Sequence, residues 1–241
     1  MLEIVRAIRA RVGNDFHLQM KISAVEHNNA LAPFEPSGNT LEDSVQVCQW
    51  LEQAGVDAFH VSTGSSFPHP KNPPGDMPIG EFLRNYDSMI SSGTHTLRNY
   101  LLFRDIITSQ IFHARWISAR GDRIEGVNLP DARAIKQAVG VPVICTGGFQ
   151  NASAIRQAIS EGSCDAVSMA RALVANNDLV TQFANGVDQP PVPCPHCNKC
   201  LINAAKNPLG CYEEARFASP EAMVGQILPV FQAVPAIGGA S

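Results

Sequence analysis

The chain has 241 residues, of which 45% are hydrophobic, so it is long enough to bury a core of ordinary size. Its net charge of −4 and its pI near 6.0 disfavour nucleic-acid binding, which needs basic residues clustered on one face. Charged residues interrupt the most apolar stretch, 97–117, so no membrane span is predicted. Seven unevenly spaced cysteines and no visible export signal indicate metal ligation and free thiols in a reducing, cytoplasmic compartment.

Hydrophobic periodicity predicts strands that alternate with helices along most of the chain. Thr40 followed by Asp43 is typical of a helix start, and Gly13 and Gly55 are typical of helix ends. In order, we expect helix 2–12, strand 16–23, loop 24–39, helix 41–54, strand 58–62, loop 63–80, helix 129–139, strand 141–146, helix 153–161, strand 165–170 and helix 178–184. This order predicts an α/β fold with a parallel sheet and helical crossovers.

Residues 81–120 stand apart from this alternation and are expected to form one or two helices. Apolar residues at helical spacing favour core packing or a subunit contact for this stretch. They are Leu97, Leu101, Leu102, Ile106, Ile107 and Ile111.

The residues most suited to ligand binding follow the predicted strands. In parallel α/β folds the ligand site lies where the carboxyl ends of the strands meet. Lys21, the 62–65 turn, Gly147-Gly148 and Ala170-Arg171 all come at such ends. Glycines would let the backbone approach a phosphate, and Arg171 could add a bidentate contact, so we predict a phosphate site here.

The stretch CPHCNKC, followed by Cys211, is the strongest chemical signal in the chain. It supplies four soft thiolate ligands, Cys194, Cys197, Cys200 and Cys211, in a spacing that favours a [4Fe-4S] cluster. Tetrahedral zinc, with His196 as a spare ligand, is the alternative. The remaining cysteines, Cys48, Cys145 and Cys164, lie in apolar contexts and are expected to be buried. His60, within a strand, is expected to be a core histidine with satisfied hydrogen bonds.

The combined motifs resemble one enzyme family. Segments VRAIR at 5–9, HVSTG at 60–64, VPVI at 141–144, Gly147-Gly148 and MARAL at 169–173 are similar to the old yellow enzyme family of FMN-dependent oxidoreductases. The cysteine-rich tail resembles the branch that contains 2,4-dienoyl-CoA reductase and trimethylamine dehydrogenase. The resemblance covers residues 1 to about 217, with no clear match in 81–120.

The resemblance implies a TIM-barrel (β/α)8-type fold and specific cofactors. Lys21 would contact the flavin pyrimidine, and Gly147, Gly148, Ala170 and Arg171 would bind the FMN phosphate. Cys194, Cys197, Cys200 and Cys211 would hold the [4Fe-4S] cluster. NAD(P)H would be the electron donor, and an activated C=C bond, as in an enone or an enoyl thioester, would be the acceptor. Removing Arg171 is expected to weaken FMN retention without iron loss, and removing Cys197 to do the reverse.

Measured against the family pattern, the chain corresponds to the C-terminal four strand–helix units of the barrel. Residues 1–185 are expected to form this half-barrel, 186–217 the cluster segment and 218–241 a tail with a short helix. The family's catalytic residues precede these units, so none is named. A second chain or a second copy is expected to pair with the open edge strands. Two alternatives stay open: a half-barrel without turnover, and an aldolase-like barrel piece with structural zinc.

Overall fold

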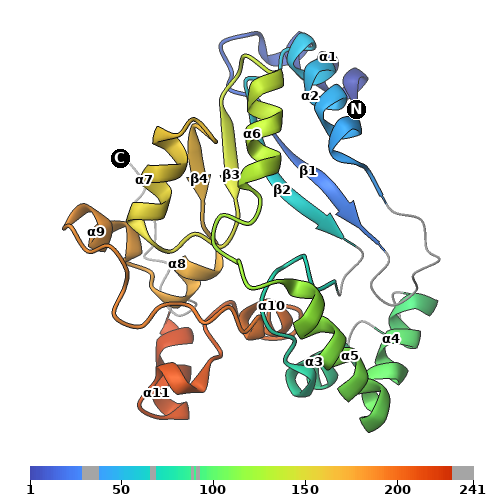
Figure 1. The fold of residues 1–241 in the computed structure, drawn as a ribbon, viewed down its shortest axis with the longest axis vertical. Coiled ribbons are helices and arrows are strands. Elements are labelled where there is room, and N and C mark those ends of the chain that lie inside the picture. The colour runs from blue at the N-terminus through green and yellow to red at the C-terminus, as the bar shows by residue number, and fades with distance from the viewer. Residues whose placement is uncertain (29–37, 66–68, 88–89, 91–92, 230–241) are drawn as a thin grey trace, which may run out of the picture.

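A four-stranded parallel sheet forms the centre of the structure, a computed structural model that describes residues 1–28, 38–65, 69–87, 90 and 93–229 (Figure 1). The strands pair in their sequence order, so the predicted parallel sheet with helical crossovers is confirmed. They are β1 (Gln19–His27), β2 (Ala58–Ser65), β3 (Val143–Thr146) and β4 (Ala166–Ser168).

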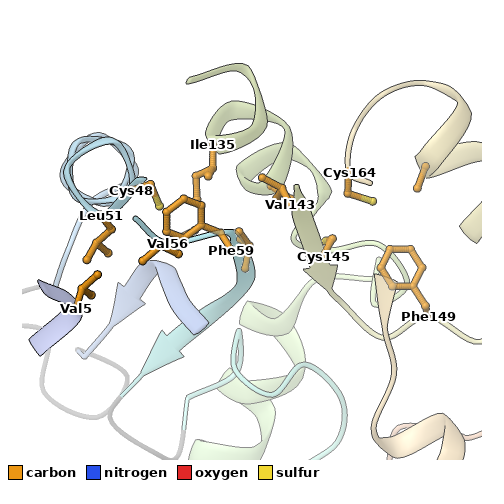
Figure 2. Close-up of a cluster of buried hydrophobic side chains, with 14 residues drawn as sticks. Val5, Cys48, Leu51, Val56, Phe59, Ile135, Val143, Cys145, Phe149 and Cys164 are labelled. Atoms are coloured by element: carbon orange, nitrogen blue, oxygen red, sulfur yellow. The ribbon is translucent and has the colours of Figure 1, made fainter. Parts of the chain in front are cut away.

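Helices cover one face of this sheet and bury the main hydrophobic core. They are α1 (Leu2–Val12), α2 (Leu41–Gln53), α6 (Leu129–Ala138) and α7 (Ala152–Ser160). Figure 2 shows Phe59 of β2 and Val143 of β3 with Leu51 of α2 and Ile135 of α6 in this core. Cys48, Cys145 and Cys164 are buried in the same cluster, as predicted.

Alternating residues of the strands face the side opposite these helices, because successive side chains of a strand point to opposite faces. His60, between the buried Phe59 and Val61, belongs to this second set. Its Nε2 lies 2.6 Å from the Ser168 hydroxyl and also contacts the Thr146 hydroxyl, and these hydroxyls lie 2.6 Å apart. The ring nitrogen of His60 therefore has hydrogen-bond partners, as predicted. These partners lie on the face of the sheet opposite the helices, so His60 is not part of the apolar core.

Local sequence signals explain several element boundaries. Thr40 and Asp43 form the predicted capping box at the start of α2. The first strand differs from its prediction, because it begins at Gln19 and runs to His27 instead of ending at Ser23. Pairing with β2 past Gly64 extends it, through a register shift between Ser23 and Glu26. Residues 29–37 of the predicted loop lie outside the described part of the chain.

Residues 79–120 form three helices, α3 (Ile79–Tyr86), α4 (Thr94–Arg104) and α5 (Ile106–Arg120). A second core holds them together, with Met77, Phe82, Phe103 and Trp116 buried beside Ile202. The predicted core packing of the aliphatic stripe is wrong, because aromatic residues occupy the inner positions. All six stripe residues are exposed, with Ile106 at 72% and Ile107 at 69%; the others are Leu97, Leu101, Leu102 and Ile111.

The C-terminal part follows β4 as short elements around the carboxyl ends of the strands (Figure 1). It contains α8 (Arg171–Ala175), α9 (Leu179–Ala184), α10 (Lys199–Asn203), a 3-10 turn (Glu214–Arg216) and α11 (Pro220–Ile227). Helix α10 packs on α3, where Asn85 Nδ2 donates to Asn203 Oδ1 at 3.4 Å. Within the described ranges, none of the helices has the length and apolar character needed to cross a bilayer.

Candidate functional site: a cavity beside a cysteine-rich segment

A cavity of about 420 Å³ lies at the carboxyl ends of the strands. This volume falls within the range of small-molecule and cofactor sites, roughly 300–1,000 Å³. The structure brings together here all five residues predicted to bind the flavin, together with one predicted cluster ligand. These lining residues are Lys21, Gly147, Gly148, Ala170, Arg171 and Cys200.

Lys21 reaches the cavity from a different place than its sequence context suggests. It is the third residue of β1 and not a residue of the strand's carboxyl end, because the strand continues to His27. It pairs in register with His60 of β2, and its ammonium group helps to lower the pKa of His60, after the larger effect of burial. Lys21 therefore brings positive charge to the β1 side of the cavity, while Arg171 lies after β4 on the opposite side.

Gly147 and Gly148 make the turn after β3, and the structure shows why glycine is needed at the second position. Gly148 has φ +68, and a Cβ there would lie 2.8 Å from the Ile124 carbonyl oxygen. The Gly147 oxygen also accepts a hydrogen bond of 2.6 Å from Gly126 N. Close packing against residues 124–128 thus sets this turn, whichever ligand the cavity takes.

The N-terminus of α7, which follows the glycine turn, is already capped by a carboxylate. Glu125 Oε1 accepts hydrogen bonds of 2.8 Å from the backbone N–H groups of both Gln150 and Asn151. Asp188 accepts further bonds from Ser153 at the same helix end. An anion in the cavity would therefore rely on the Gly147–Gly148 turn, Ala170 and Arg171 rather than on α7.

Arg171 faces the cysteine-rich segment as well as the cavity. Its Nη1 donates to Asn198 Oδ1 at 2.5 Å and to the Pro74 oxygen at 2.6 Å. Burial lowers the pKa of Arg171, and negative charge on Cys194, Cys200 and Cys197, in their thiolate forms, would oppose this shift. The described hydrogen bonds of this side chain all come from Nη1, and Arg171 is also one of the residues that line the cavity.

The four candidate ligand cysteines lie near one another at one end of the sheet. Negative charge on Cys211 would raise the pKa of Cys194, and charge on Cys194 or Cys211 would raise that of Cys200. Charge on Cys200 would in the same way raise the pKa of Cys197. Among the described residues, no three or more His, Cys, Asp or Glu side chains are arranged as ligands of a single metal ion. In a four-iron cluster each thiolate binds a different iron, so its sulfurs need not converge on one point.

Burial disfavours the charged thiolate at three of these cysteines. It raises the pKa of Cys194 and Cys200, and it raises that of Cys197 to about 12, where Glu213 adds to the effect. Metals bind the thiolate form, so metal binding would release protons from this segment.

Positive charge near the thiols fits an anionic metal–thiolate group. Burial raises the pKa of Cys194, and the positive charges of Arg171 and, more weakly, Arg216 oppose that rise. Arg216 donates from Nη1 to Val192 O and Pro193 O, and from Nη2 to Ala175 O, yet its buried Nε has no partner among the described groups. Four soft thiol donors, two arginines and an unpaired buried N–H together suit a metal–sulfur group.

Two asparagines that the motif analysis did not single out also build the site. Asn128 lines the cavity, donates to Thr146 O at 2.7 Å and accepts from the Thr63 hydroxyl at 2.6 Å. Asn198 adopts the left-handed conformation, with φ +61, inside the cysteine motif. Asparagine tolerates this conformation better than most residues. An asparagine between two cysteines of the motif was therefore the sequence signal that could have indicated a turn at this position.

Comparisons with known proteins agree with this architecture. A dihydrouridine synthase (Dus) family model matches residues 107–219. A 4,4'-dithiodibutanoate disulfide reductase of Rhodococcus erythropolis is 29% identical over 201 residues, which cover 82% of this chain and 43% of that protein. An NADH oxidase of Thermoanaerobacter brockii is 25% identical, over 99% of this chain and 29% of that protein. An NADH-dependent flavin oxidoreductase, iccE, of Talaromyces variabilis is 28% identical, over 73% of this chain and 32% of that protein.

A solved structure of a 2-naphthoyl-CoA reductase complex shares the fold, with a TM-score of 0.56 at 19% identity. The match covers 87% of this chain and 24% of that chain, and it agrees with an α/β fold of the TIM-barrel type, of which this chain forms a part. The chain spans less than half the length of each of these relatives. Together, the comparisons support a relationship with the NADH:flavin oxidoreductase superfamily.

Proposed function

We propose that the chain is the flavin-binding and cluster-binding part of an NAD(P)H-dependent oxidoreductase that uses FMN. The observation that carries this proposal is that one cavity is lined by residues from separate parts of the sequence, namely Lys21, Gly147, Gly148, Ala170 and Arg171. The relatives named NADH oxidase and NADH-dependent flavin oxidoreductase support flavin-dependent oxidoreduction in general.

In this proposal the cavity residues have separate roles along the sheet. The Gly147–Gly148 turn, Ala170 and Arg171, next to β3 and β4, bind the phosphate through backbone N–H groups and the guanidinium. Lys21, on β1 at the other end of the sheet, lies toward the ring and stabilises negative charge on it. When bound, FMN supplies hydride transfer and one-electron transfer, with an activated C=C bond of an enone or enoyl thioester as the proposed acceptor.

The cysteine-rich segment is proposed to hold a [4Fe-4S] cluster through Cys194, Cys197, Cys200 and Cys211. Cys200 also lines the cavity, so this ligand lies between the proposed cluster and the proposed flavin. Free thiols at all seven cysteines suit the reducing cytoplasm that we propose as the location.

The two open edges of the sheet indicate how the site could be completed. In the described part of the chain, β1 and β4 each pair on one side only. Unpaired parallel edges and a polar face with His60, Thr146 and Ser168 suit the interior of a closed barrel. We therefore propose that four further strands, from another polypeptide segment or a second copy, supply the rest of the barrel and the substrate-binding residues.

A half-barrel that binds cofactors without turnover is the second candidate, because no catalytic residue is identified among the described residues. Anaerobic purification, followed by absorbance spectra and flavin, iron, sulfide and zinc analysis, separates the candidates. Flavin and cluster absorption together with NAD(P)H oxidation support the enzyme, whereas both cofactors without turnover support the second candidate. Colourless protein with stoichiometric zinc, after reconstitution with FMN, iron and sulfide, contradicts both cofactor assignments.

A further inference from the structure

A hydrogen-bond network joins the proposed flavin cavity to the cysteine-rich segment. Its centre is Asn198, which is only 4% exposed and lies between Cys197 and Cys200 in the sequence. Asn198 Oδ1 accepts the 2.5 Å hydrogen bond from Arg171, so the side chain that lines the cavity is held from the cysteine segment.

The same asparagine holds the loop that follows β2. Asn198 Nδ2 donates to Asp76 O at 2.8 Å and to Pro73 O at 3.3 Å. Pro73 and its neighbour Pro74 line the cavity, and Pro74 O accepts the second bond from Arg171. One amide group therefore sets the positions of two separate parts of the cavity wall.

Backbone contacts reinforce this connection. Asp76 N donates to His196 O at 2.9 Å, and the Trp116 indole donates to Gly75 O at 2.9 Å. Gly75 approaches the His196 carbonyl oxygen so closely that a Cβ at this position would overlap it. The loop at 73–76 is consequently fixed between α5 and the cysteine-rich segment.

The cysteine segment also forms part of the cavity wall directly, through residues whose positions depend on the conformation of this segment. His196, Cys200, Leu201 and Ala204 are the residues concerned. Binding of a metal group by the four cysteines would restrict the motion of this segment, and with it the motion of Arg171 and the 73–74 loop. A ligand that then enters the cavity would lose less conformational entropy, because its binding wall is already ordered.

We infer that ligand binding in the cavity and metal loading of the cysteine segment are thermodynamically coupled, with Asn198 as the positioning residue that links them. This inference rests on the proposed function. It differs from the expectation from sequence that Arg171 and Cys197 variants lose one cofactor each without effect on the other. Coupling is reciprocal, so FMN should tighten the equilibrium binding of the metal group by the same factor by which that group tightens FMN binding.

The test measures the Kd of FMN by quenching of its fluorescence, on anaerobic protein in two states, reconstituted with iron and sulfide or stripped by a chelator. We expect iron removal to weaken FMN binding by about tenfold, within the usual range of coupling between two sites. Riboflavin, measured in parallel, should show a smaller change, because it lacks the phosphate that Arg171 would bind.

Asn198→Gly removes the amide without backbone strain, because glycine adopts φ +61 freely. This variant should bind FMN with nearly the same Kd in both iron states. Asn198→Asp keeps the acceptor for Arg171 and loses the donors to Pro73 and Asp76, so its coupling should be intermediate. Asn185→Gly, at an exposed position, is the matched control and should keep the full tenfold ratio.

Each outcome bears on one part of the inference. An unchanged Kd on iron removal in the unmodified chain would overturn the coupling while leaving the cofactor assignment intact. Full coupling in Asn198→Gly would overturn the role of Asn198. If Asn198→Gly fails to load iron, Asn198→Asp decides that role. A full tenfold difference in the Kd of FMN between the two iron states of Asn198→Asp would then overturn the role. Absence of FMN binding in both states would contradict the proposed function itself.

Discussion

Gly75→Ala provides the most direct test of how the loop after β2 is held against the cysteine-rich segment. Gly75 has φ +138, and an added Cβ would overlap the His196 carbonyl oxygen, well inside the 3.4–4 Å of ordinary van der Waals contact. The two backbones must therefore separate. Separation breaks the bond from Asp76 N to His196 O and weakens that from Trp116 to Gly75 O, both 2.9 Å long.

Gly93→Ala is the matched control, because it shares the backbone strain without the overlap. Gly93 has φ +137, and a Cβ there would meet none of the described atoms within 4 Å. The difference between the two variants thus isolates the contact with His196. Each lost hydrogen bond costs about 0.5–1.5 kcal/mol and overpacking adds about 1–3 kcal/mol. Allowing for relaxation of the loop, we expect Gly75→Ala to lower the free energy of unfolding by about 2–4 kcal/mol more than Gly93→Ala.

Tryptophan fluorescence during urea unfolding measures this difference. The chain has two tryptophans, Trp50, which is 50% exposed, and Trp116, which is 1% exposed. A Trp50→Phe background therefore leaves Trp116, which contacts the loop itself, as the reporter. Thiol labelling should also show faster reaction of Cys200 in Gly75→Ala. Equal unfolding free energies for the two alanine variants, within about 0.5 kcal/mol, would refute the reasoning.

Three further predictions address other parts of the site. Arg216→Met removes hydrogen bonds to three backbone oxygens and should lower the free energy of unfolding by about 2–3 kcal/mol in the same urea assay. The control, Arg156→Met, breaks only an exposed 3.5 Å ion pair with Asp188 and should lower it by less than about 0.5 kcal/mol. Lys136 and the Val143 N–H hold the pKa of Asp165 below its usual value, so this carboxylate stabilises the fold above the pKa of the unfolded chain, and that stability is lost as pH falls through the folded pKa. Asp165→Asn should flatten stability against pH below about pH 4, and an unchanged acid limb would contradict the assignment. Lys21→Gln should raise the pKa of His60 in an NMR titration, because it removes a nearby positive charge while the burial remains, and an unchanged pKa would place Lys21 farther from His60 than the structure does.

Local signals in the sequence were sufficient for much of the fold. Helices α1 and α2 begin and end close to their predicted residues, because caps and periodicity are short-range properties. The parallel arrangement also followed from element order, since strands separated by helices can pair in this way with right-handed crossovers. That arrangement is enough to bring Gly147 and Arg171 to one cavity.

The residues that line the second core show where periodicity failed. Leu101 and Ile107 have helical spacing that suits burial, yet Phe103 and Trp116 are the residues that pack inside. Which stripe of a helix is buried depends on its partners, here α3 and α10, and the sequence of α4 and α5 carries no information about them. A surface that is exposed in this chain can also be covered by a subunit contact, which remains a prediction.

Composition, element order and the CPHCNKC motif determined by themselves the parallel α/β class, the strand-end location of the site and the set of candidate ligands. Tertiary structure alone decided that Arg171 is held by Asn198, that Glu125 occupies the start of α7, and that β1 continues to His27. The reason is physical. Each of these features is a hydrogen bond or a strand pairing between segments tens of residues apart, and its geometry depends on the packing of the whole sheet and not on the neighbouring sequence.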